Sequence, residues 1–265
     1  MAEKAFLYDA TRCTACRGCQ VACNQWNEND EEIPTEENGV DAKNTGSYEN
    51  PPELSPQTWV KIRFAEVERN NKLSWLFTRL ACMHCTDASC ANVCPTNAIS
   101  HMEDGFVLID QDWCIGCGYC VQACPYGVPH KDEHTGTARK CTSCVDRRNE
   151  GYEPACIKAC PPNALLYGDR SILLTQARQR VNALGGNATL YGENELGGLN
   201  VLYVLDDAPE VYGLPAEPKV ATSNAIGQWI SGLLTAGLIT AVPFWFIFKR
   251  KNQIAAGELN EGGAK

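Results

Sequence analysis

The cysteines constrain this chain most, because their number and spacing leave few ways to fold it. Sixteen of its 265 residues are cysteine. They form four groups of four with none left over, which indicates an internal repeat of ligand sets. The groups are Cys13, Cys16, Cys19 and Cys23; Cys82, Cys85, Cys90 and Cys94; Cys114, Cys117, Cys120 and Cys124; and Cys141, Cys144, Cys156 and Cys160.

Three chemistries use cysteines in this density: disulfides, zinc sites and iron–sulfur clusters. Disulfides are disfavoured because the opening "MAEKAFLYDATRC" has no apolar core of a secretory signal. Zinc favours two C-x2-C pairs about 12–20 residues apart. The third group reads "CIGCGYCVQACP". It matches the C-x2-C-x2-C-x3-C-P run of bacterial ferredoxins and favours [4Fe–4S] clusters.

The spacing of that run has a mechanical cause. Its first three thiolates wrap one cluster, and the fourth, followed by proline, ligates a neighbouring cluster. The second and fourth groups keep the plan with wider loops, as C-x2-C-x4-C-x3-C-P and C-x2-C-x11-C-x3-C-P. The first group departs from it, because Asn24 follows Cys23 where the others have proline. Sixteen thiolates then supply four [4Fe–4S] clusters, and a row of clusters indicates a conduit for single electrons.

The chain offers no sign of a catalytic site. It contains no Ser-His-Asp pattern, P-loop or dinucleotide fingerprint. Its formal net charge of −9 argues against nucleic acid as a partner. We therefore expect an electron-transfer protein that is not a catalyst by itself.

The remaining sequence predicts an α+β domain over residues 1–207. Alternating apolar residues predict strands, "EDG" predicts a hairpin turn, and "SILLTQARQRVNAL" predicts a helix that ends at Gly185. An acidic surface loop is expected at 27–57 and a linker at 208–222. The expected strands are 58–69, 188–192 and 199–207, with the hairpin at 98–110 and the helix at 171–184.

A membrane helix is predicted at residues 223–250, followed by a cytoplasmic tail at 251–265. The stretch from Ala225 to Phe248 runs 24 residues without a charge, and about 20 suffice to cross a bilayer. "KRK" follows it directly, whereas Lys219 is the only cation in the 20 residues before it. The positive-inside rule then puts the C-terminus in the cytoplasm and the cysteine domain outside. We expect a single-pass protein of a bacterial inner membrane, with its cluster domain on the periplasmic side.

The four groups resemble the four-cluster ferredoxin subunits of molybdenum and tungsten oxidoreductases. "CTACRGCQVACNQWN" is similar to the first run in the beta (iron–sulfur) subunits of formate dehydrogenases. "CMHC", "CIGCGYCVQACPYGVPH" and "KCTSCVDR" resemble the same subgroup. Membrane-bound respiratory members are also similar in having one helix after the cluster domain.

The resemblance implies tandem ferredoxin-like halves that exchange their fourth ligands, so that four [4Fe–4S] clusters are bound. Cluster 1 takes Cys13, Cys16, Cys19 and Cys160; cluster 2 takes Cys141, Cys144, Cys156 and Cys23; cluster 3 takes Cys82, Cys85, Cys90 and Cys124; cluster 4 takes Cys114, Cys117, Cys120 and Cys94.

The resemblance also implies partners. Electrons from formate oxidation at a Mo/W-pterin catalytic subunit pass through the clusters to a b-type cytochrome membrane subunit and quinone. The catalytic subunit's twin-arginine signal would carry this chain across the membrane, which accounts for the missing signal. Two alternatives stay open. One is the iron–sulfur subunit of another membrane oxidoreductase, a hydrogenase or a sulfur-compound reductase. The other, of a different class, is a structural zinc-binding scaffold.

Metal analysis separates the iron and zinc interpretations. We expect about 16 iron atoms per chain and no stoichiometric zinc in the protein isolated without oxygen, because four cubanes carry four irons each. Plasma emission spectrometry against total protein measures both metals. A content near four zinc atoms per chain would reject the cluster interpretation.

Overall fold

The computed structural model describes residues 2–29, 48–69, 71–223 and 225–255. Most of the predicted acidic loop at 27–57 and most of the predicted tail lie outside these residues. The chain divides into two compact units, Met1–Ala221 and Thr222–Lys265.

The first unit holds all the cysteine groups and mixes short helices with strands. Its elements are, in chain order, β1 (Lys4–Asp9), α1 (Gly18–Trp26), β2 (Lys61–Arg69), β3 (Lys72–Leu80), α2 (Ser89–Asn92), β4 (Ile99–His101), β5 (Val107–Ile109), α3 (Tyr119–Ala123), β6 (His130–Lys131), β7 (Ala138–Arg139), α4 (Val145–Asn149), α5 (Ala155–Lys158), β8 (Leu165–Asp169), α6 (Arg170–Leu184), β9 (Thr189–Tyr191), η2 (Glu195–Gly197), β10 (Val201–Leu205) and η3 (Pro209–Tyr212).

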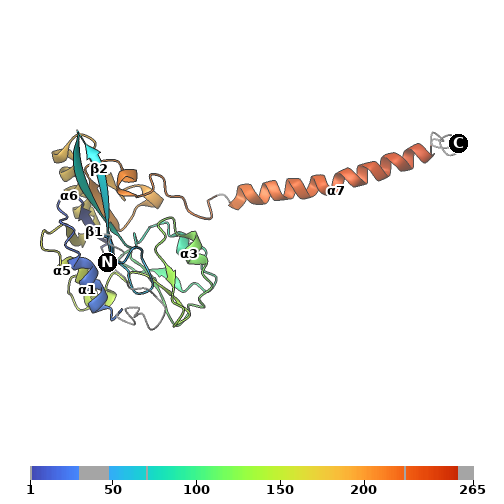
Figure 1. Ribbon diagram of the computed structural model, residues 1–265. Helices are drawn as coiled ribbons and strands as arrows, with labels where there is room; N and C mark the ends of the chain where they lie inside the picture. The colour runs from blue at the N-terminus through green and yellow to red at the C-terminus, as the bar shows by residue number, and fades with distance from the viewer. Residues whose placement is uncertain (1, 30–47, 70, 224, 256–265) are drawn as a thin grey trace. The chain divides into compact units, whose positions relative to one another are not determined.

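A four-stranded sheet in the order β8-β1-β10-β9 separates two cores. In Figure 1, β1 and α6 lie together at one end of this unit. Successive side chains of a strand point to opposite faces. On β1, Ala5 and Leu7 pack with the side chains of α6, whereas Phe6 and Tyr8 pack in the larger core that contains Cys19. The sheet therefore presents one apolar face to α6 and the other to the cysteine groups.

A long hairpin leads into the second cysteine group. β2 and β3 pair antiparallel from Lys61 opposite Leu80 to Arg69 opposite Lys72. Phe64 and Phe77 face each other across the hairpin with ring centroids 5.1 Å apart. Cys82 follows the end of β3 almost at once, so the register of this hairpin positions the group that begins there.

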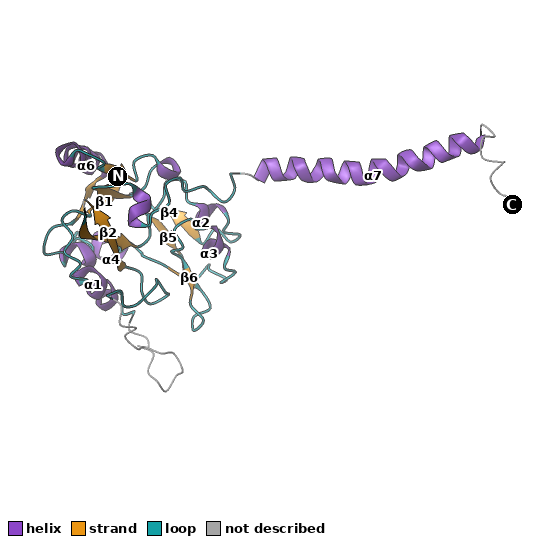
Figure 2. Ribbon diagram, turned by 45° about the horizontal axis from the view of Figure 1, so that its top comes forward, coloured by secondary structure: helices purple, strands orange, loops and turns teal. Residues whose placement is uncertain are grey.

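The short helices pair in a way that sequence order does not suggest. α1, which carries part of the first cysteine group, contacts α5 of the fourth group. α2 of the second group contacts α3 of the third, and these two helices lie near β4 and β5 in Figure 2. This arrangement gives the unit two halves, one built by the outer pair of groups and one by the inner pair.

Several predicted elements are confirmed. α6 ends at Leu184 before Gly185, and β4 and β5 form the predicted hairpin. β9 and β10 occupy the two predicted strand segments. The segment predicted as a linker differs in character, because Tyr212 and Leu214 are buried in the larger core and the first unit continues to Ala221.

The second unit contains one long helix, α7 (Ala225–Ala255). Its stretch Trp229–Ile254 is long and apolar enough to span a membrane, and none of its most apolar window is buried inside the structure. Pro243 lies inside α7, and the helix continues past it to Ala255. The helix therefore extends beyond the predicted boundary at residue 250.

Candidate metal centre

None of the sixteen cysteines, all of which lie among the described residues, forms a disulfide, and fourteen of them are buried or half-buried. Cys16 and Cys117 are the two exposed ones. Cys16 belongs to the outer pair of groups and Cys117 to the inner pair, so each half of the unit has one thiol at the surface.

A cavity in the outer half is lined by four cysteines from two distant groups. Cys141, Cys144 and Cys156 of the fourth group surround it together with Cys23 of the first. Burial raises the pKa of Cys23, and the negative charge of the other three cysteines adds to that shift. These four thiols are the set that the resemblance assigns to cluster 2.

The other cysteines of the outer half also gather across the chain. Burial raises the pKa of Cys13, and the charges of Cys160 and Cys16 raise it further. Burial raises the pKa of Cys19 to about 12, and the charges of Cys156, Cys13 and Cys160 add to this shift while that of Arg79 opposes it. The first group and the last cysteine of the fourth therefore share one electrostatic environment.

In the inner half, a cysteine of the third group lies near the cysteines of the second. Burial raises the pKa of Cys90 to about 12, and the charges of Cys82 and Cys124 contribute. Burial likewise raises the pKa of Cys85, with Cys82, Cys124 and Cys90 adding to the shift. Cys124 thus lies among the cysteines of the second group although it belongs to the third.

The last cysteine of the second group likewise lies near the cysteines of the third. Burial raises the pKa of Cys120 to about 11, with contributions from Cys114, Cys117 and Cys94.

Among the described residues, no three His, Cys, Asp or Glu side chains converge as they would around a single metal ion.

A left-handed residue lies two positions after the first cysteine of every group. These residues are Ala15, His84, Gly116 and Ser143, with φ between 46° and 63°. The turn directs backbone N–H groups at sulfur. Ala15 N–H lies 3.4 Å from Cys13 Sγ, and Ser143 N–H lies 3.3 Å from Cys141 Sγ. Only Gly116 signals such a turn in the sequence, since the other three side chains seldom adopt positive φ.

The Cys-Pro turn after the second group provides further donors. Asn97, three residues after Cys94, has a φ of 54°. Burial opposes ionisation of Cys94, but hydrogen bonds from the Thr96 hydroxyl and from backbone N–H groups including those of Ala98 and Ile99 outweigh it, so its pKa is lowered. Hydrogen bonds to an anionic sulfur favour the thiolate that a metal requires.

The first group replaces this turn with a helix, which explains its missing proline. α1 continues through Cys23 to Trp26, so Asn24 is an interior helical residue whose N–H is needed. Proline there would remove a helical hydrogen bond and clash with the preceding turn. Asn27 ends the helix, and its side-chain Nδ2 lies 2.7 Å from the Cys23 carbonyl and 3.6 Å from Cys23 Sγ.

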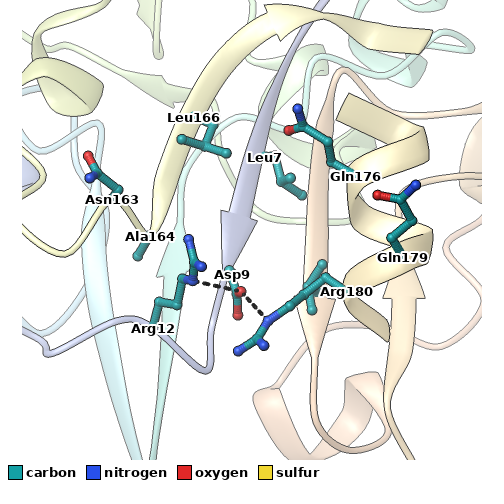
Figure 3. A pocket seen from close by; sticks show the side chains of 10 residues that line it. Leu7, Asp9, Arg12, Asn163, Ala164, Leu166, Gln176, Gln179 and Arg180 are labelled. Carbon is teal, nitrogen blue, oxygen red and sulfur yellow. Dashed lines mark hydrogen bonds and ion pairs between the residues drawn. The ribbon is translucent and has the colours of Figure 1, made fainter. Parts of the chain in front are cut away.

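The loop into the first group is held at the end of β1. Asp9 accepts hydrogen bonds from the Thr11 hydroxyl at 2.6 Å and from Arg180 Nε at 2.9 Å, while Arg12 lies 3.6 Å away (Figure 3). Asp9, Arg12 and Arg180 line a cavity of about 360 Å³ that no cysteine borders. The carboxylate of Asp9 offsets both guanidinium charges, so these contacts fix the chain just before Cys13.

The residues of the outer half fit an anionic group. Arg79 on β3 is completely buried, and its Nε and Nη1 atoms have no hydrogen-bond partner among the described residues. Burial opposes its charge, but the negative potential of Cys156, Tyr203, Cys141 and Cys19 prevails and raises its pKa. Buried donors are almost always paired, so these orphaned atoms suit the thiolates and sulfides of a bound cluster. No sequence pattern marked this arginine.

Paired cysteine groups on short helices, with N–H groups turned toward sulfur, define a ferredoxin-like iron–sulfur protein. Two family models, each describing a 4Fe-4S dicluster domain, match residues 12–98 and 73–170. Iron–sulfur clusters are therefore the cofactors, and the zinc alternative loses its basis.

Similar proteins of known function show which group of iron–sulfur proteins this chain belongs to. The chain is 40% identical over 247 residues to the iron-sulfur subunit of the nitrate-inducible formate dehydrogenase of Escherichia coli (strain K12), covering 90% of this chain and 81% of the relative. It is 41% identical over 229 residues to the formate dehydrogenase iron-sulfur subunit of Haemophilus influenzae, covering 83% and 71%. A component of the anaerobic dimethyl sulfoxide reductase of E. coli is 36% identical over 163 residues, or 62% of this chain and 72% of the relative. The chain belongs to the formate dehydrogenase iron–sulfur subunits.

Two glycines of the third group make a matched test of the ligand turn. A Cβ at Gly116 would lie 1.8 Å from the Gly136 carbonyl oxygen, whereas one at Gly118 would meet nothing within 4 Å. Both have positive φ, which costs an L-residue about 1–2 kcal/mol. We expect Gly116→Ala to lose the cluster bound by the third group and Gly118→Ala to keep it, as measured by iron content and paramagnetic resonance. Full iron retention in Gly116→Ala would contradict this account.

Proposed function

We propose that this chain carries electrons from a Mo/W-pterin subunit that oxidises formate to a b-type cytochrome in the membrane, which reduces quinone. The relatives that are named as subunits of formate dehydrogenases support a catalytic partner. The candidate membrane span supports a membrane acceptor. When bound, the clusters take up and release single electrons; the chain holds them, shields them from water and sets their spacing.

The observation that carries this proposal is the convergence of cysteines from groups far apart in the chain. Cys23 lines one cavity with Cys141, Cys144 and Cys156, more than a hundred residues away. Such sharing ties neighbouring clusters together, which a conduit needs and separate structural sites do not.

We assign sixteen cysteines as ligands of four [4Fe–4S] clusters on this basis. The sets are Cys13, Cys16, Cys19 and Cys160; Cys141, Cys144, Cys156 and Cys23; Cys82, Cys85, Cys90 and Cys124; and Cys114, Cys117, Cys120 and Cys94. Exposed Cys16 and Cys117 lie in different halves, so one half can face the electron donor and the other the acceptor.

The chain's placement in the membrane follows from charge. Lys249, Arg250 and Lys251 lie in the last part of α7, and Lys249 contacts the Trp245 ring at 5.0 Å. Cations flanking a span favour the cytoplasmic side. The cluster-binding domain is then on the periplasmic side of the inner membrane, with residues 208–222 leading to the helix.

A second candidate is the iron–sulfur subunit of another membrane oxidoreductase. The similarity to a component of a dimethyl sulfoxide reductase supports it. Both candidates use the same clusters, so the partner subunit decides between them.

A substrate assay of the native complex separates the two. The complex, purified through a tag on this chain, is expected to reduce an artificial dye with formate as donor. Dye reduction with hydrogen, or oxidation of reduced dye by a sulfoxide, is the control activity. Either control activity without formate oxidation would reject the formate proposal.

The exchanged ligands are tested by a reciprocal pair of substitutions. We expect Cys23→Ser to damage the cluster held by Cys141, Cys144 and Cys156, and Cys160→Ser to damage the one held by the first group, because fourth ligands cross between runs. Paramagnetic resonance of the reduced complex measures each signal. If each substitution instead removed the signal of the cluster in its own run, the ligand sets would be wrong.

A further inference from the structure

Arg79 is the most unusual cation of the first unit. It lies on β3 opposite Ile62, with no exposed surface. Its guanidinium lies 5.9 Å from the centre of the Phe6 ring, and the Tyr203 hydroxyl donates to its backbone carbonyl at 2.7 Å. Those contacts fix the residue but do not neutralise its charge.

Other deeply buried cations have conventional partners. Lys61 pairs with Glu49, and Arg148 pairs with Asp104. Lys140 donates to backbone carbonyls, including that of Cys141 at 3.3 Å. Arg79 forms no ion pair with any carboxylate of the described residues, and two of its three nitrogens have no hydrogen-bond partner there. An uncompensated buried charge is strongly unfavourable, so a negative group must face it.

The sulfur atoms around Arg79 come from two different ligand sets. Nη2 lies 3.9 Å from Cys156 Sγ. The charges of Cys141 and Cys19 also act on the guanidinium. Cys156 and Cys141 belong to the proposed set of cluster 2, whereas Cys19 belongs to cluster 1. Arg79 therefore contacts a proposed ligand of cluster 2, and it is within electrostatic reach of Cys19, a proposed ligand of cluster 1 that packs in the same core as Cys156.

A fixed cation at this place has a defined electrostatic consequence. Reduction adds an electron to a cluster that its thiolate ligands already make anionic. A nearby positive charge stabilises the reduced form more than the oxidised form, and in a dry interior the effect is poorly screened. Net charge and hydrogen bonds near the sulfurs are known determinants of cluster potential.

We propose that Arg79 is a positioning residue that raises the reduction potentials of clusters 1 and 2, and of cluster 2 most, more than it raises those of the inner half. This inference rests on the proposed function, because it requires both clusters to be present. One residue outside all four cysteine groups would then give the clusters of the outer half higher reduction potentials than they would otherwise have.

Redox titration of the whole complex tests it. Signals are assigned with the Cys23→Ser and Cys160→Ser variants, and midpoint potentials are read by paramagnetic resonance in the unmodified complex and in Arg79→Met and Arg79→Gln. We expect at least a tenfold loss in the equilibrium constant for reducing cluster 2, about 59 mV for a one-electron couple. Cluster 1 is expected to shift less in the same direction, and clusters 3 and 4 to shift least, because no sulfur of the inner half is among the main charges acting on Arg79.

A matched control removes the same charge from the same hairpin. Arg69 on β2 is partly exposed and already pairs with Asp206 and Asp207. Arg69→Gln is therefore expected to leave all potentials unchanged. Equal potentials in the unmodified, Arg79→Met and Arg79→Gln complexes would overturn the proposal, as would equal shifts in all clusters.

If both neutral variants fail to bind cluster 2, the Arg79→Lys variant tests whether the positive charge is what the cluster requires. Retained charge is then expected to restore cluster content and visible absorbance. Loss of the cluster in Arg79→Lys as well would mean that the shape of the guanidinium, not its charge, is required, and would overturn the proposal. Fewer than two cluster signals in the unmodified complex would instead reject the proposed function itself.

Discussion

The fold depends on keeping anionic sulfur in a dry interior. Each thiolate buried there needs a compensating donor, metal or cation. A left-handed residue follows two positions after each leading cysteine, and in the first and fourth groups its N–H lies within 3.4 Å of the cysteine sulfur, so the chain itself supplies part of that compensation. Helix contacts between α1 and α5, and between α2 and α3, then bring sulfurs from separate groups together. The four-stranded sheet and α6 close one side of this core.

The cysteine spacing predicted the cofactor class and its chemistry, because ligand geometry restricts sequence directly, whereas the two halves followed only from the resemblance to a known family. Strands β9 and β10 and helix α6 were also predictable from their apolar periodicity. β1 and β8 were not predicted, although β1 lies at the centre of the sheet. Its run "KAFLYD" has both faces buried, so it shows no alternation to recognise.

The buried side chains outside the cysteine pattern owe their positions to contacts between distant segments. Arg79 looks like an ordinary strand residue in the sequence, and its neighbours Cys156 and Phe6 come from segments that are far apart along the chain. His84 lies buried inside the second group, where its Nδ1 lies 3.1 Å from both the N–H and the carbonyl of Val107. Local propensity says nothing about either position. By contrast, the absence of proline after Cys23 was visible in the sequence, and only its cause required the structure.

The uninterrupted α1 has a consequence for electron tunnelling. Cys19 and Cys23 belong to different proposed clusters, yet they occupy one nine-residue helix, one turn apart. At about 1.5 Å of rise per residue, their attachment points are separated by roughly 6 Å along the helix axis. The distance between the two proposed clusters that Cys19 and Cys23 ligate therefore depends in part on the geometry of this helix. In this assignment, one helical turn helps to set the distance between the two clusters, and with it the rate of electron transfer between them.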